Sequence, residues 1–94
     1  MKIVWTAPAR RDLREIYQYI AQDNPHAALH LQTQIRERVT LLGSHPQLGR
    51  PGRIDGTREL VMADNPYILP YRIQSARIEI LAVYHGARRW PEAL

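Results

Sequence analysis

The C-terminal part of the chain contains side chains that could act on a phosphodiester. The run reads Tyr84-His85-Gly86-Ala87-Arg88-Arg89-Trp90. Cleavage of RNA through its own 2′-hydroxyl needs a base, an acid for the leaving oxygen, and cations that stabilise the charge on the phosphorane. His85 is a candidate acid or base, and Arg88 is a candidate cation. The same pattern also fits a tyrosine in the core, a hydrogen-bonded histidine at a strand end, and solvated arginines.

A second group of candidates lies in a glycine-rich stretch that carries three arginines. Arg50 and Arg53 stand in the run 49–53, Gly-Arg-Pro-Gly-Arg, and Arg58 follows shortly after. Glycines let the backbone approach a ligand closely, and guanidinium groups bind phosphates or carboxylates through paired hydrogen bonds. The stretch is therefore either a surface for an acidic macromolecule or a rigid connector whose arginines cap strand carbonyls. The chain lacks the Gly-x4-Gly-Lys-Ser/Thr loop that cradles nucleotides, which argues against nucleotide hydrolysis.

Two histidines, His26 and His30, stand four residues apart, a spacing at which two imidazoles on one helix can share a zinc ion. No glutamate follows His26, no third ligand is evident, and the chain has no cysteine. We therefore expect no metal site and no cofactor. Asp12 and Glu15 are expected to pair with neighbouring arginines along a solvated helix face.

Composition and charge limit the class of protein. The chain has 94 residues, which is enough for one domain spanning residues 1–94, and 45% of them are apolar. Its net charge is +4, and twelve of the thirteen basic residues are arginine, which favours directed contacts to carboxylates or phosphates. No apolar run reaches the roughly 20 residues that a membrane helix needs, and the N-terminal apolar stretch is too short for a signal peptide. We expect a cytoplasmic protein without a membrane partner.

Hydrophobic periodicity predicts the elements that position these candidates. Lys2 to Trp5 is typical of a short strand. Thr6 is expected to cap a helix that runs to about Gln22. A second helix is predicted to begin after the cap Asn24 and to end at Gly43. The short turn between the two helices implies an antiparallel helical hairpin.

The second half of the chain is predicted to form an antiparallel sheet. Residues Ser44–Thr57 are expected to form a loop, followed by strands over Arg58–Ala63, Tyr67–Ile73 and Arg77–Tyr84. Pro70 cannot donate to a neighbouring strand, so we expect a bulge or an unpaired position there. The last strand is apolar on both faces and should lie inside the sheet. The predicted fold is α+β, in the order βααβββ, with the helical hairpin packed on one face of a small, mainly antiparallel sheet.

The chain resembles the toxins of type II toxin–antitoxin modules, the RelE/ParE superfamily, also described as plasmid-stabilisation proteins. The resemblance runs nearly end to end and depends on a series of short motifs in a fixed order. They are Trp5; Ala9, Asp12-Leu13, Ile16 and Tyr19-Ile20; Asp23-Asn24-Pro25 with Ala27-Ala28; His45-Pro46 with Leu48-Gly49; Gly56-Thr57-Arg58-Glu59-Leu60; Tyr71-Arg72; and Ile78-Glu79-Ile80-Leu81-x-Val83-x-His85. The βααβββ order agrees with the fold of this superfamily.

The resemblance implies one of two mechanisms. RelE-like members cut mRNA in the ribosomal A site with arginines, a lysine pair and a terminal tyrosine, whereas ParE-like members inhibit DNA gyrase. Ile68 stands where the nucleases carry an arginine, no lysine pair is present although Arg50 and Arg53 could replace it, and no tyrosine follows Tyr84. The Val-x-His ending of the last strand is more similar to the ParE-like side. The sequence therefore favours inhibition of gyrase.

Two alternatives remain open at this point: a ribosome-dependent mRNA endonuclease, and a weakly toxic member that acts mainly as an antitoxin-bound co-repressor. If the chain is a nuclease, the resemblance implies His85, Arg88, Arg58 and Arg72 as catalytic residues. For binding a target or partner we expect Arg50, Arg53, Tyr84, Arg89 and Trp90. All readings imply a cognate antitoxin with an acidic binding segment, gyrase or the translating ribosome with its mRNA as target, and operator DNA bound only through the antitoxin.

Overall fold

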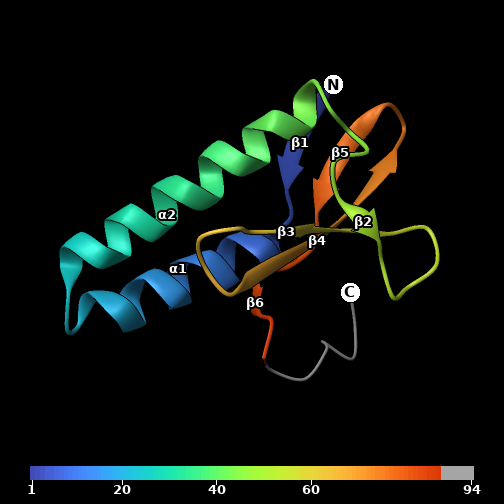
Figure 1. Cartoon of the computed structure of the whole chain (residues 1–94). Coiled ribbons are helices and arrows are strands. Elements are labelled where there is room, and N and C mark those ends of the chain that lie inside the picture. The colour runs from blue at the N-terminus through green and yellow to red at the C-terminus, as the bar shows by residue number, and fades with distance from the viewer. Residues whose placement is uncertain (88–94) are drawn as a thin grey trace.

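The computed structural model describes residues 1–87 of the chain (Figure 1). Two helices, one 3₁₀ turn and six strands follow one another in the order β1, α1, α2, η1, β2, β3, β4, β5 and β6. Their bounds are β1 Lys2–Trp5, α1 Ala7–Ala21, α2 Pro25–Thr40, η1 Leu41–Gly43, β2 Arg50–Pro51, β3 Arg58–Val61, β4 Tyr67–Gln74, β5 Arg77–Ile80 and β6 Tyr84–His85.

Both helices begin where local sequence predicts. The hydroxyl of Thr6 accepts a hydrogen bond from the amide of Ala9 at 3.4 Å, and the side chain of Asn24 accepts one from Ala27 at 3.1 Å. These bonds satisfy amide groups that the first helical turn leaves without partners. The second helix is shorter than predicted, because α2 ends at Thr40 and a 3₁₀ turn continues to Gly43.

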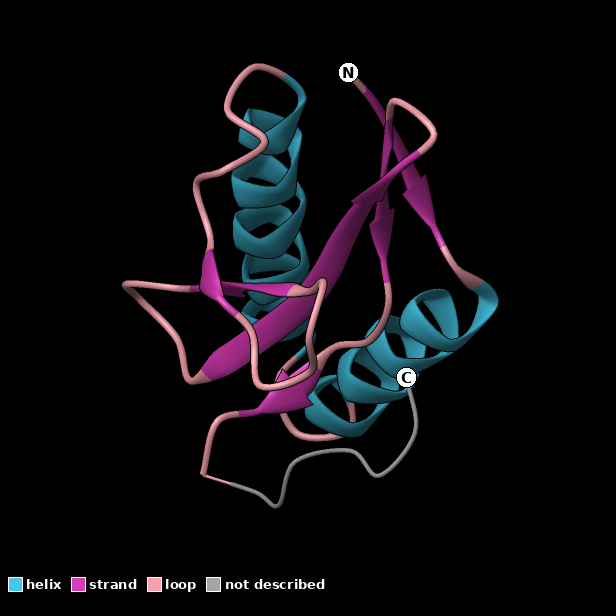
Figure 2. Ribbon diagram, turned by 90° about the vertical axis from the view of Figure 1, so that its right-hand side faces the viewer, coloured by secondary structure: helices cyan, strands magenta, loops and turns pink. Residues whose placement is uncertain are grey.

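The six strands form one mixed sheet in the order β1-β5-β4-β3-β2, and β6 pairs with β4. β1 runs parallel to β5, whereas the other pairs are antiparallel. Figure 2 shows β4 as the longest strand, which crosses the sheet obliquely. Its first residues pair with β6 and its last residues with β5, so both of these strands lie along the edge of β4 opposite β3.

The predicted last strand, Arg77–Tyr84, is wrong in its extent. It is split into β5 and β6 by residues 81–83, of which Leu81 still donates its amide to the carbonyl of Pro70 at 2.9 Å. Three positions separate Ile68 from Tyr71 on β4, but four separate their partners Tyr84 and Ile80, so the partner side contains one extra residue. The sequence predicted a bulge or an unpaired position at Pro70, and a bulge does occur there, with the extra residue in the segment opposite Pro70.

The loop predicted over Ser44–Thr57 is also more ordered than expected. Arg50 and Pro51 form the short edge strand β2, in which Arg50 pairs with Glu59 and Pro51 with Arg58. The expectation that the run beginning at Arg77 lies inside the sheet is confirmed for β5, which has β1 on one side and β4 on the other.

The helices cover one face of the sheet, as predicted. α1 and α2 pack against each other (Figure 1), and both contribute to a single core. The core joins the helix residues Ala9, Leu13, Ile35 and Val39 to the strand residues Leu60, Leu69, Tyr71, Ile78 and Ile80. The strand residues between them point to the opposite face, which we call the far face. Within residues 1–87, no helix is both long and apolar enough to cross a bilayer.

Candidate functional site

The far face has a buried carboxylate on β3, next to the edge strand β2. Glu59 alternates with core residues on β3 and so points away from the helices, yet only 2% of its surface is exposed. β2 places Arg50 directly opposite, and the Nε atom and one terminal nitrogen of Arg50 contact Oε1 of Glu59 at 2.9 and 2.8 Å. The amide of Arg53 donates to Oε2 at 3.3 Å. A buried charge needs such partners, so Glu59 organises the loop that carries both arginines.

Tyr84 joins this group from the end of the chain. β6 pairs Tyr84 with Ile68, which places its ring on the far face. Burial raises the pKa of the Tyr84 hydroxyl, the charge of Glu59 raises it further, and Arg53 and Arg50 oppose both effects. The hydroxyl therefore stays protonated at neutral pH. We call Arg50, Arg53, Glu59 and Tyr84 the far-face cluster.

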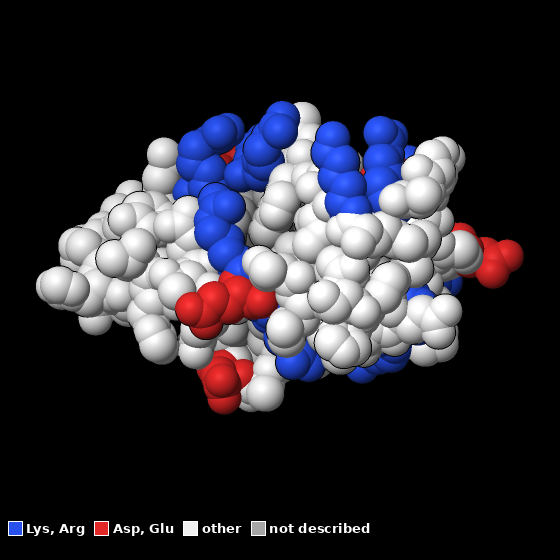
Figure 3. All heavy atoms as spheres, turned by 90° about the horizontal axis from the view of Figure 1, so that it is seen from above, with Lys and Arg blue, Asp and Glu red and all other residues white. Residues whose placement is uncertain are grey.

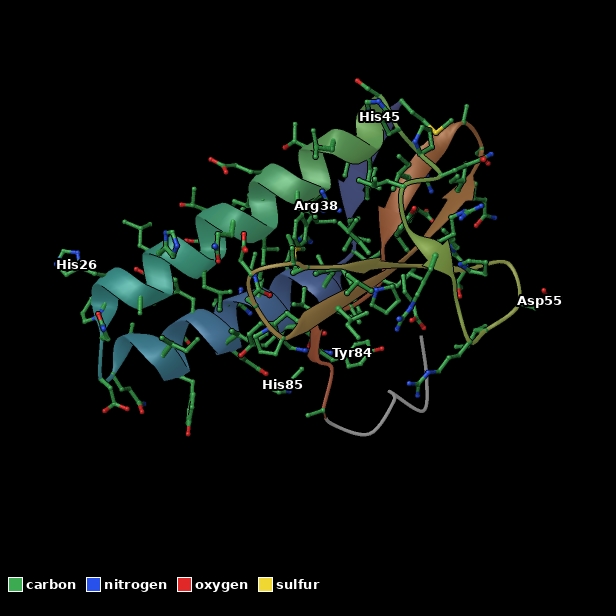
Figure 4. All side chains as sticks on the ribbon, viewed as in Figure 1. His26, Arg38, His45, Asp55, Tyr84 and His85 are labelled. Carbon is green, nitrogen blue, oxygen red and sulfur yellow. The ribbon has the colours of Figure 1, made fainter. Side chains whose placement is uncertain are left out.

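His85 lies on the other side of β6, although it follows Tyr84 directly (Figure 4). Its ring packs edge-on against Tyr67, with 5.5 Å between ring centroids, and its Nδ1 atom accepts a hydrogen bond from Ala87 at 3.1 Å. His85 borders a groove of about 490 Å³ that Asp12 and Glu15 of α1 also line. Alternation along a strand thus separates the candidate base from the arginines of the far face.

The remaining arginine candidates are held by other parts of the chain. Arg58 pairs with Tyr71 on the helix side of the sheet, and its guanidinium donates to the carbonyl of Gly49 at 2.6 Å. Arg72 lies on the far face, where its Nε contacts Glu79 at 2.5 Å. The hydrogen bond from Arg72, more than that from Arg77, lowers the pKa of Glu79, while burial opposes the shift.

The structure therefore brings together Arg50, Arg53 and Tyr84 but not His85, Arg58 and Arg72. The other candidates, Arg88, Arg89 and Trp90, lie outside the described residues. Between residues 1 and 87 no group of three or more His, Cys, Asp or Glu side chains is placed to hold a metal ion. His26 lies at the tip of the helical hairpin, well away from Tyr84 and His85 (Figure 4).

Tyr71 attaches the loop that carries Arg50 and Arg53 to the sheet, although it was not among the site residues predicted from the sequence. The buried Tyr71 hydroxyl donates to the carbonyl of Pro46 and accepts from the amide of Gly49, both at 2.8 Å. A side chain at position 49 would come within 2.6 Å of Cε1 of Tyr71 and 2.7 Å of the Glu59 carbonyl. Only glycine fits this contact, so Tyr71 and Gly49 together determine where the loop starts.

Two further positioning residues were missed. Asp12 was expected to pair with an arginine of its own helix, but it does not. Its carboxylate instead accepts a hydrogen bond at 3.1 Å from the amide of Val83, within the bulged segment. Asp12 directly precedes Leu13, so it lies at the border of the buried stripe of α1. This border position was the sequence signal that could have predicted a contact between Asp12 and the rest of the fold. Glu59 was named only within a motif, because nothing local predicts that a glutamate beside Arg58 is buried.

Comparison with known proteins assigns the family. Residues 3–90 match the model of the ParE toxin of the type II toxin–antitoxin system parDE. The chain belongs to this toxin family. The toxin is 50% identical over 93 residues to the protein provisionally named toxin Y4kP of Sinorhizobium fredii, covering 99% of this chain and 96% of that protein. It is 32% identical over 87 residues to toxin RelE2 of Caulobacter vibrioides, with 93% and 97% covered.

Solved structures agree. A chain from the chromosomal ParDE system of P. aeruginosa matches the toxin with a TM-score of 0.80 and 32% identity, covering 90% of the toxin and 95% of that chain. A chain of the RelBE2 toxin–antitoxin complex of Mycobacterium tuberculosis matches with a TM-score of 0.64 and 27% identity, covering 89% and 95%. The predicted superfamily and fold are confirmed. The chain is the toxin of a type II toxin–antitoxin module, and a cognate antitoxin is its partner.

Proposed function

We propose that this toxin arrests growth by binding DNA gyrase, and not by cutting RNA. The observation that carries the proposal is the separation of His85, Arg58 and Arg72, the candidate nuclease residues that lie within the described part of the chain. His85 lies on the helix side of β6, Arg58 is bound to a carbonyl, and Arg72 is paired with Glu79. Phosphodiester cleavage requires its base, acid and cations within hydrogen-bond reach of one phosphate. These three side chains do not converge in that way.

The far-face cluster supports a binding role. Arg50 is about half exposed at 54% of its side chain, while its partner Glu59 is buried, so the pair presents an oriented guanidinium at the surface. Glu59 accepts hydrogen bonds from Arg50 and from the amide of Arg53, so the carboxylate is already engaged within the protein. A fixed guanidinium beside a tyrosine is typical of residues that dominate protein–protein interfaces. We therefore assign gyrase recognition to the far face.

Adjacent residues on opposite faces of β6 provide the test. Tyr84→Ala removes a ring from the far face, whereas His85→Ala removes one from the helix side. We expect purified wild-type toxin to inhibit supercoiling by gyrase, Tyr84→Ala to weaken inhibition about tenfold or more, and His85→Ala to stay within about twofold. Circular dichroism of both variants checks that each remains folded. Loss of activity in His85→Ala alone would contradict the assigned surface.

The competing function is a ribosome-dependent mRNA endonuclease, which the similarity to toxin RelE2 and to the RelBE2 complex favours. Expression of the toxin in a growing host separates the two mechanisms. Gyrase inhibition gives DNA breaks and SOS induction with intact mRNA, whereas an endonuclease gives codon-phased cuts in translated mRNA that primer extension detects. Such cuts would contradict the gyrase mechanism and support the endonuclease. Absence of growth arrest would instead favour an antitoxin-bound co-repressor.

A further inference from the structure

A second group of cations lies on the far face, at the end of the sheet that the β4–β5 hairpin forms. Strand register places Lys2 of β1 beside Arg77 of β5, and Glu79 of β5 beside Arg72 of β4. Side chains of paired residues point to the same face, and neighbouring strands lie about 4.8 Å apart. Lys2, Arg72 and Arg77 therefore stand together on three adjacent strands, and we call them the β5 cation group.

Glu79 holds the two arginines of this group in place. Its Oε1 atom accepts a hydrogen bond from Nε of Arg72 at 2.5 Å. Its Oε2 atom accepts from Nε and from a terminal nitrogen of Arg77, at 3.1 and 2.8 Å. Only 6% of the surface of Glu79 is exposed, whereas the side chains of Arg72 and Arg77 are 47% and 49% exposed. The carboxylate is thus covered, and the guanidinium groups that it orients remain at the surface.

The charge of the β5 cation group is only partly neutralised. Glu79 supplies one negative charge for two arginines. Lys2 is exposed and forms no ion pair within residues 1–87. Figure 3 shows Lys and Arg side chains standing together along one edge of the molecule. Three positive charges therefore stand against one negative charge, and that negative charge is buried.

The surface around the β5 cation group favours a phosphodiester backbone as its partner. The neighbours on the same face are Gln74, paired with Arg77, and the half-buried Val4, paired with Glu79. Protein interfaces depend on buried aromatic or large apolar anchors, which these residues do not include. Phosphates need only cations and N–H donors, and one guanidinium matches two phosphate oxygens at once. A small phosphate compound would need an enclosing cavity, whereas both arginines are about half exposed on an open strand face.

We propose that the β5 cation group binds the sugar–phosphate backbone of duplex DNA, an inference that rests on the proposed action on gyrase. Gyrase acts on duplex DNA, so a toxin bound to gyrase has this polyanion nearby. Tyr84 of the far-face cluster is paired with Ile68, and Arg72 lies four residues further along β4, a distance of roughly 13 Å. One face thus presents a protein-binding end and a DNA-binding end. Contacts to phosphates carry no sequence information, so binding should not depend on base sequence.

The test measures the affinity of the full-length toxin for a fluorescent DNA duplex of about 20 base pairs, by anisotropy over a series of salt concentrations. Each phosphate contact contributes about 0.9 to the slope of log affinity against log salt, because binding releases condensed counterions. Lys2→Gln removes a cation without an ion pair in the described chain. We expect the slope to fall by about 0.9 and the affinity to fall about eightfold at ~0.1 M salt. Lys2→Arg keeps the charge and should retain the wild-type slope.

Arg11→Gln is the matched control, because Arg11 is exposed on α1 and the substitution changes the net charge by the same amount. We expect its slope to stay within about 0.2 of wild type. Equal losses in Lys2→Gln and Arg11→Gln would overturn the proposal, because they would indicate attraction by overall charge. Absence of DNA binding by the wild type would overturn it as well. So would tighter, Lys2-dependent binding of a single-stranded RNA of the same length.

Supercoiling by gyrase is measured with the same variants and with Tyr84→Ala, so failure of the DNA contact is distinguishable from failure of the gyrase mechanism. DNA affinity that depends on Lys2, without inhibition of gyrase by the wild type, would support the DNA contact and contradict the gyrase mechanism. Inhibition that Tyr84→Ala weakens, together with an unchanged salt slope in Lys2→Gln, would support the gyrase mechanism and overturn the DNA contact.

Discussion

Replacing Tyr71 by phenylalanine tests whether one hydroxyl holds the functional loop on the sheet. The substitution removes a single oxygen from a fully buried side chain and leaves the ring in place. Two hydrogen bonds of 2.8 Å are lost, one to the carbonyl of Pro46 and one from the amide of Gly49. Gly49 is buried, so its amide loses its acceptor in a place that water reaches poorly.

The expected loss follows from these contacts. A buried polar group left without a partner costs roughly 1–3 kcal/mol, so we expect Tyr71→Phe to lower the free energy of unfolding by about 2 kcal/mol. For a domain of this size that corresponds to a fall in Tm of about 10 °C. Urea unfolding followed by circular dichroism measures the change, and the m-value should stay constant because the same surface is exposed on unfolding.

Alkaline pH provides a second readout. Burial raises the pKa of Tyr71 above its ordinary value of 10.0. As the pH rises, the unfolded chain therefore loses the phenolic proton first, and the stability that the neutral phenol contributes falls above about pH 10. The Tyr71→Phe variant has no phenolic proton at this position, so its free energy of unfolding should fall less steeply with pH above about pH 10. Tyr84 also has a raised pKa, so some alkaline loss persists in the variant.

Tyr19→Phe is the matched control, because the side chain of Tyr19 is 74% exposed. Its stability should stay within about 0.5 kcal/mol of wild type. If Tyr71→Phe is as stable as this control at neutral pH, the hydroxyl does not hold the loop and the reasoning fails. Hydrogen exchange adds a local test: in Tyr71→Phe the amide of Gly49 should exchange faster, while amides in α1 should keep their protection.

Two further predictions concern the β4–β5 hairpin. Ser75 and Ala76 both have positive φ angles, 53° and 58°, a conformation that favours Asn-Gly, so the double substitution Ser75→Asn with Ala76→Gly should raise the free energy of unfolding by about 1 kcal/mol. An unchanged urea midpoint would show that the turn is not strained. Arg72 and Arg77 lower the pKa of Glu79 below its ordinary 4.5, so wild-type stability should fall as the pH drops below about 4.5 through the folded pKa. Glu79→Gln should flatten that part of the stability–pH profile, and an equally steep acid loss in Glu79→Gln would assign it to other carboxylates.

Short-range chemistry was sufficient to predict the helical half of the fold. Thr6 and Asn24 cap helices because their side-chain oxygens accept from amides three residues ahead, and such bonds depend only on neighbouring residues. The superfamily was also recognisable, because its motifs keep their order along the chain. The split of the last strand was not predictable. Whether residues 81–83 stay in the ladder depends on Pro70 in another strand, and on the amide of Val83 finding Asp12 in a helix.

For the functional surfaces, too, some features follow from the sequence and others only from the tertiary structure. The sequence by itself determined which groups are available: an arginine-rich chain, Tyr84 beside His85, and Arg50 and Arg53 in a glycine-containing loop. Only the tertiary structure decided which of them act together. Strand register turns Tyr84 and His85 to opposite faces and buries Glu59 against Arg50. The ion pairs Arg50–Glu59 and Arg72–Glu79 join neighbouring strands of the sheet, so the charges that remain for a partner follow from the fold and not from composition.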